Sequence, residues 1–224
     1  MSQHGNKAQK KLAKKKAKRN ERRSVMPRRP DAWMEIAFRS AAEWPVLEAL
    51  VPVNLWVEGM GALVIARQMP DGRVAFANFL VDTYCLGVKN AAYKIASPIE
   101  YRAMKAELNR VGRQRPVAPE MFAKLIADAV EYARAIGFEP HPDFDPAQLL
   151  LAGIDTSACT DRFEFGKVGK PFYVQGPHDS PARASAIAAK VQAAGGHFAI
   201  VSGGMGTDLG LGLDDDLDDE AIEE

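Results

Sequence analysis

Hydrophobic residues recur along this chain with a helical period in some segments and with a strand period in others. The most regular helical pattern runs from Pro119 to Ile136, where apolar side chains fall on one stripe and Gly137 follows as a stop. A second helix is predicted over residues 98–111, with Ser97 as N-cap and Glu100 three residues later as its capping-box partner. These two segments are predicted helices in the middle of the chain.

Three shorter helices are predicted from start and stop signals. One lies in AAEWPVLEAL (41–50), starting either after Ser40 or later, and a proline in a first turn favours the later start. Another begins with Asp145 as its cap and passes through QLLLA before Gly153. The third runs from residue 181 to about 194 behind Ser180.

The strand period appears in GALVIARQ (61–68) and RVAFANFLVD (73–82), which are separated by the turn signal MPDG. Together they predict a hairpin, and the second run is apolar on both faces, as in a strand covered on both sides. A second hairpin is predicted in FEFGKVGKPFYV (163–174) around GKVG, and HFAIVS (197–202) is a candidate last strand.

Hairpins and helices that do not alternate regularly predict an α+β fold, with two β-hairpins and about four to five helices. The chain is long enough for one hydrophobic core, so we expect a single globular domain over residues 31–202. Residues 1–30 are predicted to be a disordered basic tail and linker, and residues 203–224 a disordered Gly-rich and acidic tail.

Formal charge changes this picture, because the net charge of zero conceals a strong separation along the chain. Residues 1–29 hold twelve Lys and Arg against a single acid, and residues 208–224 hold nine acids and no base. The remaining 17 basic and 19 acidic residues leave the body near neutral. The charged segments at the two ends are therefore the sequence's strongest electrostatic features.

Apolar runs and cysteines favour a cytoplasmic location. No run approaches the roughly 20 apolar residues of a membrane-spanning helix, and no secretion signal follows the basic start. We therefore expect no membrane partner. Only Cys85 and Cys159 are present, so reduced thiols are expected, and the spacing of cysteines and histidines fits no common zinc site.

Three segments, FLVDTYCLGVKN (79–90), GFEPHPDF (137–144) and FEFGKVGKPFYVQGPHDS (163–180), resemble an uncharacterised family of bacterial proteins. The resemblance spans roughly residues 45–190 of the sequence. It implies a bacterial globular domain, and it carries no activity, cofactor or catalytic residue to any position of this chain.

Candidate catalytic residues follow the end of a predicted strand, where side chains enter loops that often carry function. Asp82, Cys85 and Lys89 lie there, and a cysteine near a helix N-terminus has a lowered pKa that suits a nucleophile. The alternative is that Cys85 packs as a small apolar residue while Asp82 caps the following turn. The sequence leaves both interpretations open.

Two other constellations carry possible ligand chemistry. His141, Asp143 and Asp145 occur at alternate positions, where they suit a divalent cation held beside Asp155 or Asp161, although Asp145 is also explained as a cap. A separate anion site is suggested by three residues that precede the last predicted helix: Lys167, Lys170 and His178. A tight glycine turn is the plainer explanation for that segment.

The leading functional prediction is nonspecific nucleic-acid binding, with RNA or the ribosome favoured over a specific DNA operator. The predicted contacts are the tail residues Lys7, Lys10, Lys11, Lys14, Lys15, Lys16, Lys18, Arg19, Arg22 and Arg23. One alternative is a metal-dependent nuclease or other phosphoester hydrolase using residues among Asp82, His141, Asp143 and Asp155. Another is a protein-interaction module acting through the charged tails. No cofactor or oligomeric state is indicated.

Overall fold

A computed structural model describes residues 32–176 and 179–199. Contacts divide the chain into two units, residues 1–37 and 38–224. The described part of the first unit belongs to helix α2 (Ala32–Phe38), whose last residue opens the second unit. In the described residues, no helix has the length and apolar character needed to cross a membrane.

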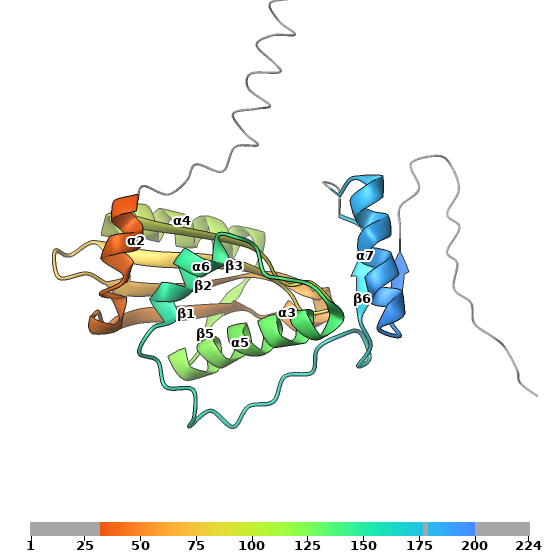
Figure 1. The fold of residues 1–224 in the computed structure, drawn as a ribbon. Helices are drawn as coiled ribbons and strands as arrows, with labels where there is room; N and C mark the ends of the chain where they lie inside the picture. Colours follow the sequence, from red (N-terminus) through yellow and green to blue (C-terminus); the bar gives the residue numbers. More distant parts are fainter. Residues whose placement is uncertain (1–31, 177–178, 200–224) are drawn as a thin grey trace, which may run out of the picture. The chain divides into compact units, whose positions relative to one another are not determined.

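The second unit is built on a five-stranded antiparallel sheet in the order β4-β3-β2-β1-β5 (Figure 1). Its strands are β1 (Val46–Pro52), β2 (Met60–Gln68), β3 (Val74–Asp82), β4 (Gly87–Ala96) and β5 (Gln114–Pro116). A short helix, α3 (Leu55–Glu58), connects β1 to β2. With helices packed on this sheet, the predicted α+β class is confirmed.

The predicted β2–β3 hairpin is confirmed, with Gln68 opposite Val74 and Met60 opposite Asp82. The turn is closed by the Met69 amide, which donates to the Arg73 carbonyl at 2.9 Å. Residues of β3 are buried on both faces, as the sequence indicated. Side chains of β3 therefore pack into the core on both sides of the sheet.

The predicted helix in residues 41–50 is wrong, because this segment contains only a 3-10 turn, η1 (Ala41–Glu43), followed by strand β1. Strand β1 lies between β2 and β5, where Ala49, Leu50 and Val51 are all buried. Pairing on both edges satisfies the backbone, and burial on both faces obscures the alternation that identifies a half-exposed strand. Tertiary contacts therefore outweigh local helix propensity here.

Strand β4 was not predicted from the sequence, and it forms a second hairpin with β3 through the turn 83–86. The register contains a bulge: Leu80 pairs with Asn90 and Val81 pairs with Val88, which leaves Lys89 as the extra residue. Gly87 (φ +61°) suits this turn, because a Cβ there would lie 2.6 Å from the Ala129 carbonyl oxygen. The hairpin therefore approaches the neighbouring helix closely.

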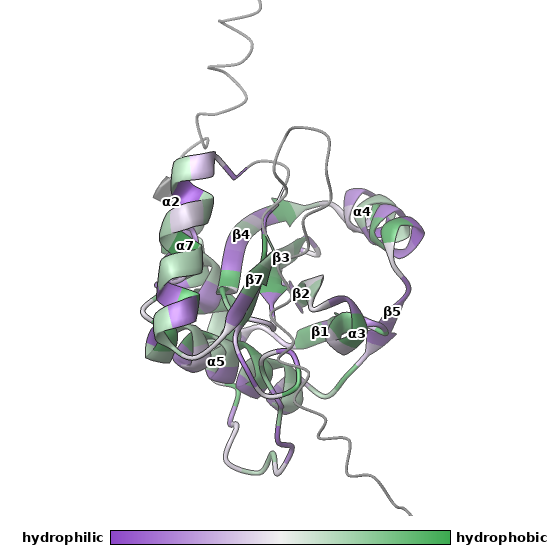
Figure 2. Ribbon diagram, turned by 90° about the vertical axis from the view of Figure 1, so that its right-hand side faces the viewer, coloured by the Kyte–Doolittle hydropathy of each residue, from purple (hydrophilic) through white to green (hydrophobic). Residues whose placement is uncertain are grey.

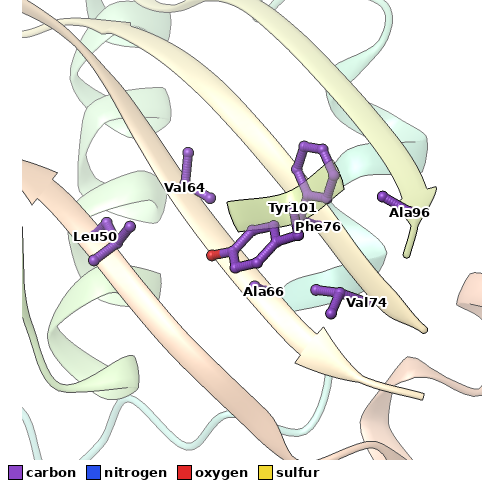
Figure 3. Close-up of a cluster of buried hydrophobic side chains, with 7 residues drawn as sticks. All are labelled: Leu50, Val64, Ala66, Val74, Phe76, Ala96 and Tyr101. Carbon is purple, nitrogen blue, oxygen red and sulfur yellow. The ribbon is translucent and has the colours of Figure 1, made fainter. Parts of the chain in front are cut away.

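Helix α4 (Pro98–Val111) covers one face of the sheet. The predicted capping box is present, since the Glu100 amide donates to Ser97 Oγ and the Ser97 amide donates to Glu100 Oε2. Figure 3 shows the core beneath this helix, where Tyr101 meets the Phe76 ring at 5.4 Å between centroids. This cluster comprises Leu50, Val64, Ala66, Val74, Phe76, Ala96 and Tyr101.

The opposite face of the sheet is covered by α5 (Pro119–Ile136), whose boundaries match the prediction. Phe79 on β3 contacts Phe122 of α5 and Phe144 of the short helix α6 (Phe144–Ala147). In Figure 2 strands β1 and β3 are mostly hydrophobic and β5 is hydrophilic, whereas α4 and α5 carry both colours, as amphipathic helices do. A two-sided core follows from this arrangement.

A buried arginine fastens the segment after α6 to the sheet. Arg67 on β2 is 3 % exposed and donates to the carbonyls of Leu150, Trp44 and Ala152 at 2.6–2.7 Å. Leu150 belongs to η2 (Gln148–Leu151). The predicted cap Asp145 is wrong, because α6 begins at Phe144 and the Asp145 carboxylate instead accepts from the Gln148 amide group.

The C-terminal part contains β6 (Phe172–Val174), α7 (Pro181–Ala193) and β7 (His197–Ala199). Helix α7 is capped by Ser180 as predicted, and β7 confirms the start of the predicted last strand. The hairpin expected around GKVG is reduced to one bridge between Lys167 and Lys170. Strand β6 instead pairs in parallel with β7, a long-range partner that local sequence does not reveal.

Candidate functional site

The predicted residues Asp82 and Cys85 lie at the turn of the β3–β4 hairpin. The Asp82 Oδ1 atom accepts from the amides of Tyr84 and Cys85, both at 2.9 Å. Desolvation raises the pKa of Asp82 despite these hydrogen bonds and the nearby charge of Lys89. This carboxylate therefore shapes the turn, as a capping aspartate does.

Cys85 is fully buried in the same turn. No helix starts there, so the prediction that Cys85 lies near a helix N-terminus is wrong. Burial, followed by the negative charge of Asp82, raises the pKa of the thiol. Its neighbours are apolar and come largely from β6 and α7: Leu86, Tyr173, Ala184, Ile187, Ala188 and Val191. These contacts support the packing interpretation and disfavour a reactive thiolate.

Lys89 is the extra residue of the β-bulge, and a bulge commonly changes the direction in which a side chain points. Its Nζ atom lies 3.9 Å from Asp179 Oδ2, and the Lys89 side chain is only 20 % exposed. Gly176 leaves space beside this pair, since a Cβ on it would lie 3.0 Å from Asp179 Oδ2 and 3.4 Å from Lys89 Nζ. The bulge thus links β4 to the segment before α7.

Asp179 joins this group although it was not among the residues predicted from the sequence. Its Oδ2 accepts from the Tyr173 hydroxyl and the Gly176 amide, both at 3.0 Å, and Arg183 Nε lies 3.4 Å from Oδ1. Burial would raise the pKa of Asp179, but these hydrogen bonds and the charges of Lys89 and Arg183 outweigh burial and lower it. We call Asp82, Cys85, Lys89 and Asp179 the hairpin-end cluster.

His141 and Asp143 lie beside β4 without joining the hairpin-end cluster through any hydrogen bond or ion pair in the described residues. The His141 amide donates to the Val88 carbonyl at 3.0 Å, and its Nδ1 accepts from the Asp143 amide at 3.2 Å. The Asp143 carboxylate is 3.8 Å from the same ring nitrogen. These contacts stabilise the local loop.

The other proposed metal ligands also serve local turns. Asp155 accepts from the Ser157 amide at 2.9 Å, and this hydrogen bond lowers the pKa of Asp155. Asp161 lies 3.6 Å from the Cys159 thiol. Among the described residues, no group of three or more His, Cys, Asp or Glu side chains is arranged to hold a metal ion.

The residues of the predicted anion site have separate surroundings. Lys167 lies over the Phe172 ring, 4.5 Å from its centroid, in the tight turn that also contains Lys170. At the N-terminus of α7, Asp179 already supplies a carboxylate to the neighbouring cations. His178 and the basic tail residues lie outside the described residues, so those predictions stay untested.

An aromatic groove lies near the β3–β4 turn, and its aromatic residues were not among the site residues predicted from the sequence. It consists of two adjoining hollows of about 480 Å³ and about 750 Å³, which share Trp56, Arg162 and Phe163. The first is lined further by Arg115, Val117, Ala118, Met121 and Asp161. The second is lined further by Glu164, Phe165, Gly166, Val168 and Gly169.

The rings of the aromatic groove support one another. Trp56 on α3 stacks on Phe163 at 5.9 Å and 13°, and Phe165 meets Trp56 edge-on at 5.6 Å. Tyr132 on α5 stacks on Phe165 at 5.1 Å, and burial raises the pKa of Tyr132 to about 12. The groove therefore has an organised aromatic wall.

The hairpin turn holds this wall in place. The Tyr84 hydroxyl donates to the Val57 carbonyl of α3 at 3.0 Å, and the Tyr132 hydroxyl donates to the Tyr84 carbonyl at 3.2 Å. The Gly166 amide donates to the Thr83 carbonyl at 2.9 Å. The predicted site residues thus contribute indirectly, by shaping the turn on which the groove rests.

The polar residues of the groove are less constrained than those of the hairpin-end cluster. Arg115 and Arg162 are exposed, and neither forms an ion pair with another residue in the part of the chain that the structure describes. Asp161 and Glu164 balance their formal charge. In sequence, the only signal was alternation of charged and aromatic residues in RFEF (162–165), which resembles an ordinary strand.

Comparisons of this chain with protein-family models, with curated proteins and with solved structures find no match. The resemblance of its motifs to a bacterial family therefore stays a prediction.

Proposed function

We propose that this protein binds nucleic acid nonspecifically through its basic N-terminal segment, with RNA or the ribosome favoured over an operator in DNA. The observation that carries this proposal is the ratio of twelve Lys and Arg to one acid in residues 1–29. Closely spaced cations displace counterions from phosphates, which gives an affinity that depends on charge and not on base sequence. The near-neutral body offers no comparable concentration of positive charge.

The geometry of the described domain supports a binding protein more than the nuclease alternative. A metal-dependent hydrolase needs carboxylates that converge beside an open site. Here the carboxylates of Asp82 and Asp155 accept hydrogen bonds from backbone amides in their own turns. The carboxylate of Asp143 lies beside the His141 ring. These contacts favour nucleic-acid binding over hydrolysis as the proposed function.

Deletion of residues 1–24 tests this proposal most simply. We expect the deletion to lower RNA affinity strongly at about 50 mM salt. It should also flatten the plot of log affinity against log salt concentration, whose slope for single strands is roughly −0.7 per neutralised phosphate. Undiminished binding after deletion would contradict the proposal.

A tail of unchanged length from which ten positive charges are removed provides the matched control. In it, glutamine replaces Lys7, Lys10, Lys11, Lys14, Lys15, Lys16, Lys18, Arg19, Arg22 and Arg23. This variant should behave like the deletion, because the proposal depends on charge and not on length. Salt-sensitive self-association without RNA binding would instead support the interaction-module alternative.

A further inference from the structure

The aromatic groove offers a surface that the basic tail lacks, because no aromatic residue is interleaved among the tail's charges. Trp56 is 36 % exposed although two phenylalanine rings contact it. Every nucleobase has a flat face, and proteins that bind single strands use exposed aromatic rings as platforms for such faces. We propose that the aromatic groove binds the bases of single-stranded nucleic acid, an inference that rests on the proposed nucleic-acid binding.

The arginines complement such a ligand. Arg115 and Arg162 line the first hollow together with the stacked pair of Trp56 and Phe163. A planar guanidinium group stacks on a base or pairs with a phosphate, and these two groups have no carboxylate partner within the described ranges. They are therefore available to a ligand without the loss of an existing ion pair.

The hollows have the size of ordinary ligand pockets. Their volumes, about 480 Å³ and about 750 Å³, lie in the range of roughly 300–1,000 Å³ that is usual for ligand pockets. Val168 lines the second hollow, is 96 % exposed and has a φ of 54°. A β-branched residue is strained in this conformation, and such strain concentrates at functional sites.

The groove should distinguish single strands from duplexes. Bases in a duplex are already stacked and paired, so they cannot also stack on Trp56. Because Asp161 and Glu164 offset the two arginines, the groove adds little net charge. Its contribution to affinity should therefore depend on bases and vary little with salt, whereas the contribution of the tail should depend on phosphates and vary steeply with salt.

An abasic oligonucleotide separates these two contributions. The full-length protein would be titrated with a single-stranded RNA of about 12 nucleotides, with a duplex, and with an abasic strand of the same phosphate number. We expect the ordinary single strand to bind at least about fivefold more tightly than the abasic strand, even at about 200 mM salt. Equal affinity for the two strands would overturn the inference.

Substitutions at Trp56 locate the effect. Trp56→Leu keeps apolar packing and removes the aromatic face, so it should weaken binding of the ordinary strand at least about fivefold and leave the abasic strand unaffected. Trp56→Phe should retain most of the affinity. Phe198→Leu is the matched control, because Phe198 is also an exposed aromatic residue (42 %) and lines neither hollow.

The two proposals fail in different ways. If the tail deletion abolishes binding while Trp56→Leu binds the ordinary strand like the wild type, the groove proposal is wrong and the proposed function stands. That is also the result expected of a groove that binds an extended peptide. If the full-length protein binds no RNA at either salt concentration, both are wrong.

Discussion

The hairpin-end cluster and the aromatic groove use polar residues in opposite ways. In the cluster, Asp82 and Asp179 accept hydrogen bonds from the surrounding backbone or side chains, and Cys85 is sealed by apolar neighbours. In the groove, Arg115 and Arg162 are exposed and, among the described residues, form no ion pair. Reactive residue types alone therefore do not identify a binding surface; open space and unused hydrogen-bonding capacity are needed as well.

The strongest effect we expect is a difference in solvent accessibility between the thiols of Cys85 and Cys159. Cys85 is fully buried with a raised pKa, whereas Cys159 is partly exposed. In native protein at a pH of about 8, we expect an alkylating reagent to label Cys85 at least about a hundredfold more slowly than Cys159. Mass spectrometry of the wild type and of Cys159→Ser would measure this difference. Rapid labelling of native Cys159→Ser would show that the cluster is open.

The role of Asp82 in the turn predicts a large loss of stability on truncation. Asp82→Ala removes the acceptor of two backbone amides and should lower the free energy of unfolding by about 2 kcal/mol. Asp82→Asn keeps an acceptor oxygen and should cost roughly half as much. Urea unfolding of both variants provides the measurement, and equal costs would contradict this role.

Comparing the wild type with Asp82→Asn also tests how the stability contributed by Asp82 depends on pH. The pKa of Asp82 is raised in the folded protein. The contribution of its carboxyl group to folding stability is therefore fully present below the ordinary pKa of 3.8 and is lost as pH rises through the folded-state pKa. The stability of the wild type relative to Asp82→Asn should therefore fall as pH rises.

Lys89 should have a smaller effect. Lys89→Met removes a cation 3.9 Å from Asp179, which keeps Tyr173, Gly176 and Arg183 as partners. We expect a loss of about 1 kcal/mol in the free energy of unfolding. A neutral or stabilising result would show that the bulged lysine does not fasten β4 to the segment before α7.

Sequence patterns predicted elements whose determinants are local. The caps at Ser97 and Ser180, the stripe of α5 and the β2–β3 turn all depend on neighbouring residues. Strand β1 was mistaken for a helical segment and strand β4 was not predicted, because their pairing partners are brought together only in the folded sheet. The approach of Asp179 to Lys89 likewise depends on a bulge and on a contact between residues far apart in sequence.

The groove could not be predicted for a related reason. Trp56, Arg115 and Phe163 come from three segments that are separate in the sequence and meet only in the folded protein. Each resembles an ordinary element in sequence: a short helix, an edge strand and a connecting segment. Only their combination leaves an exposed aromatic platform beside arginines that, within the described residues, have no ion-pair partner.

The most direct test is a crossed comparison of Lys89→Met and Trp56→Leu, measuring both urea unfolding and affinity for the same single-stranded RNA. We predict that Lys89→Met loses about 1 kcal/mol of stability with unchanged affinity, and that Trp56→Leu loses at least about fivefold in affinity while remaining folded. If Lys89→Met instead weakens RNA binding in a folded protein and Trp56→Leu binds normally, the functional surface is the hairpin-end cluster, and the assignment of base binding to the aromatic groove is contradicted.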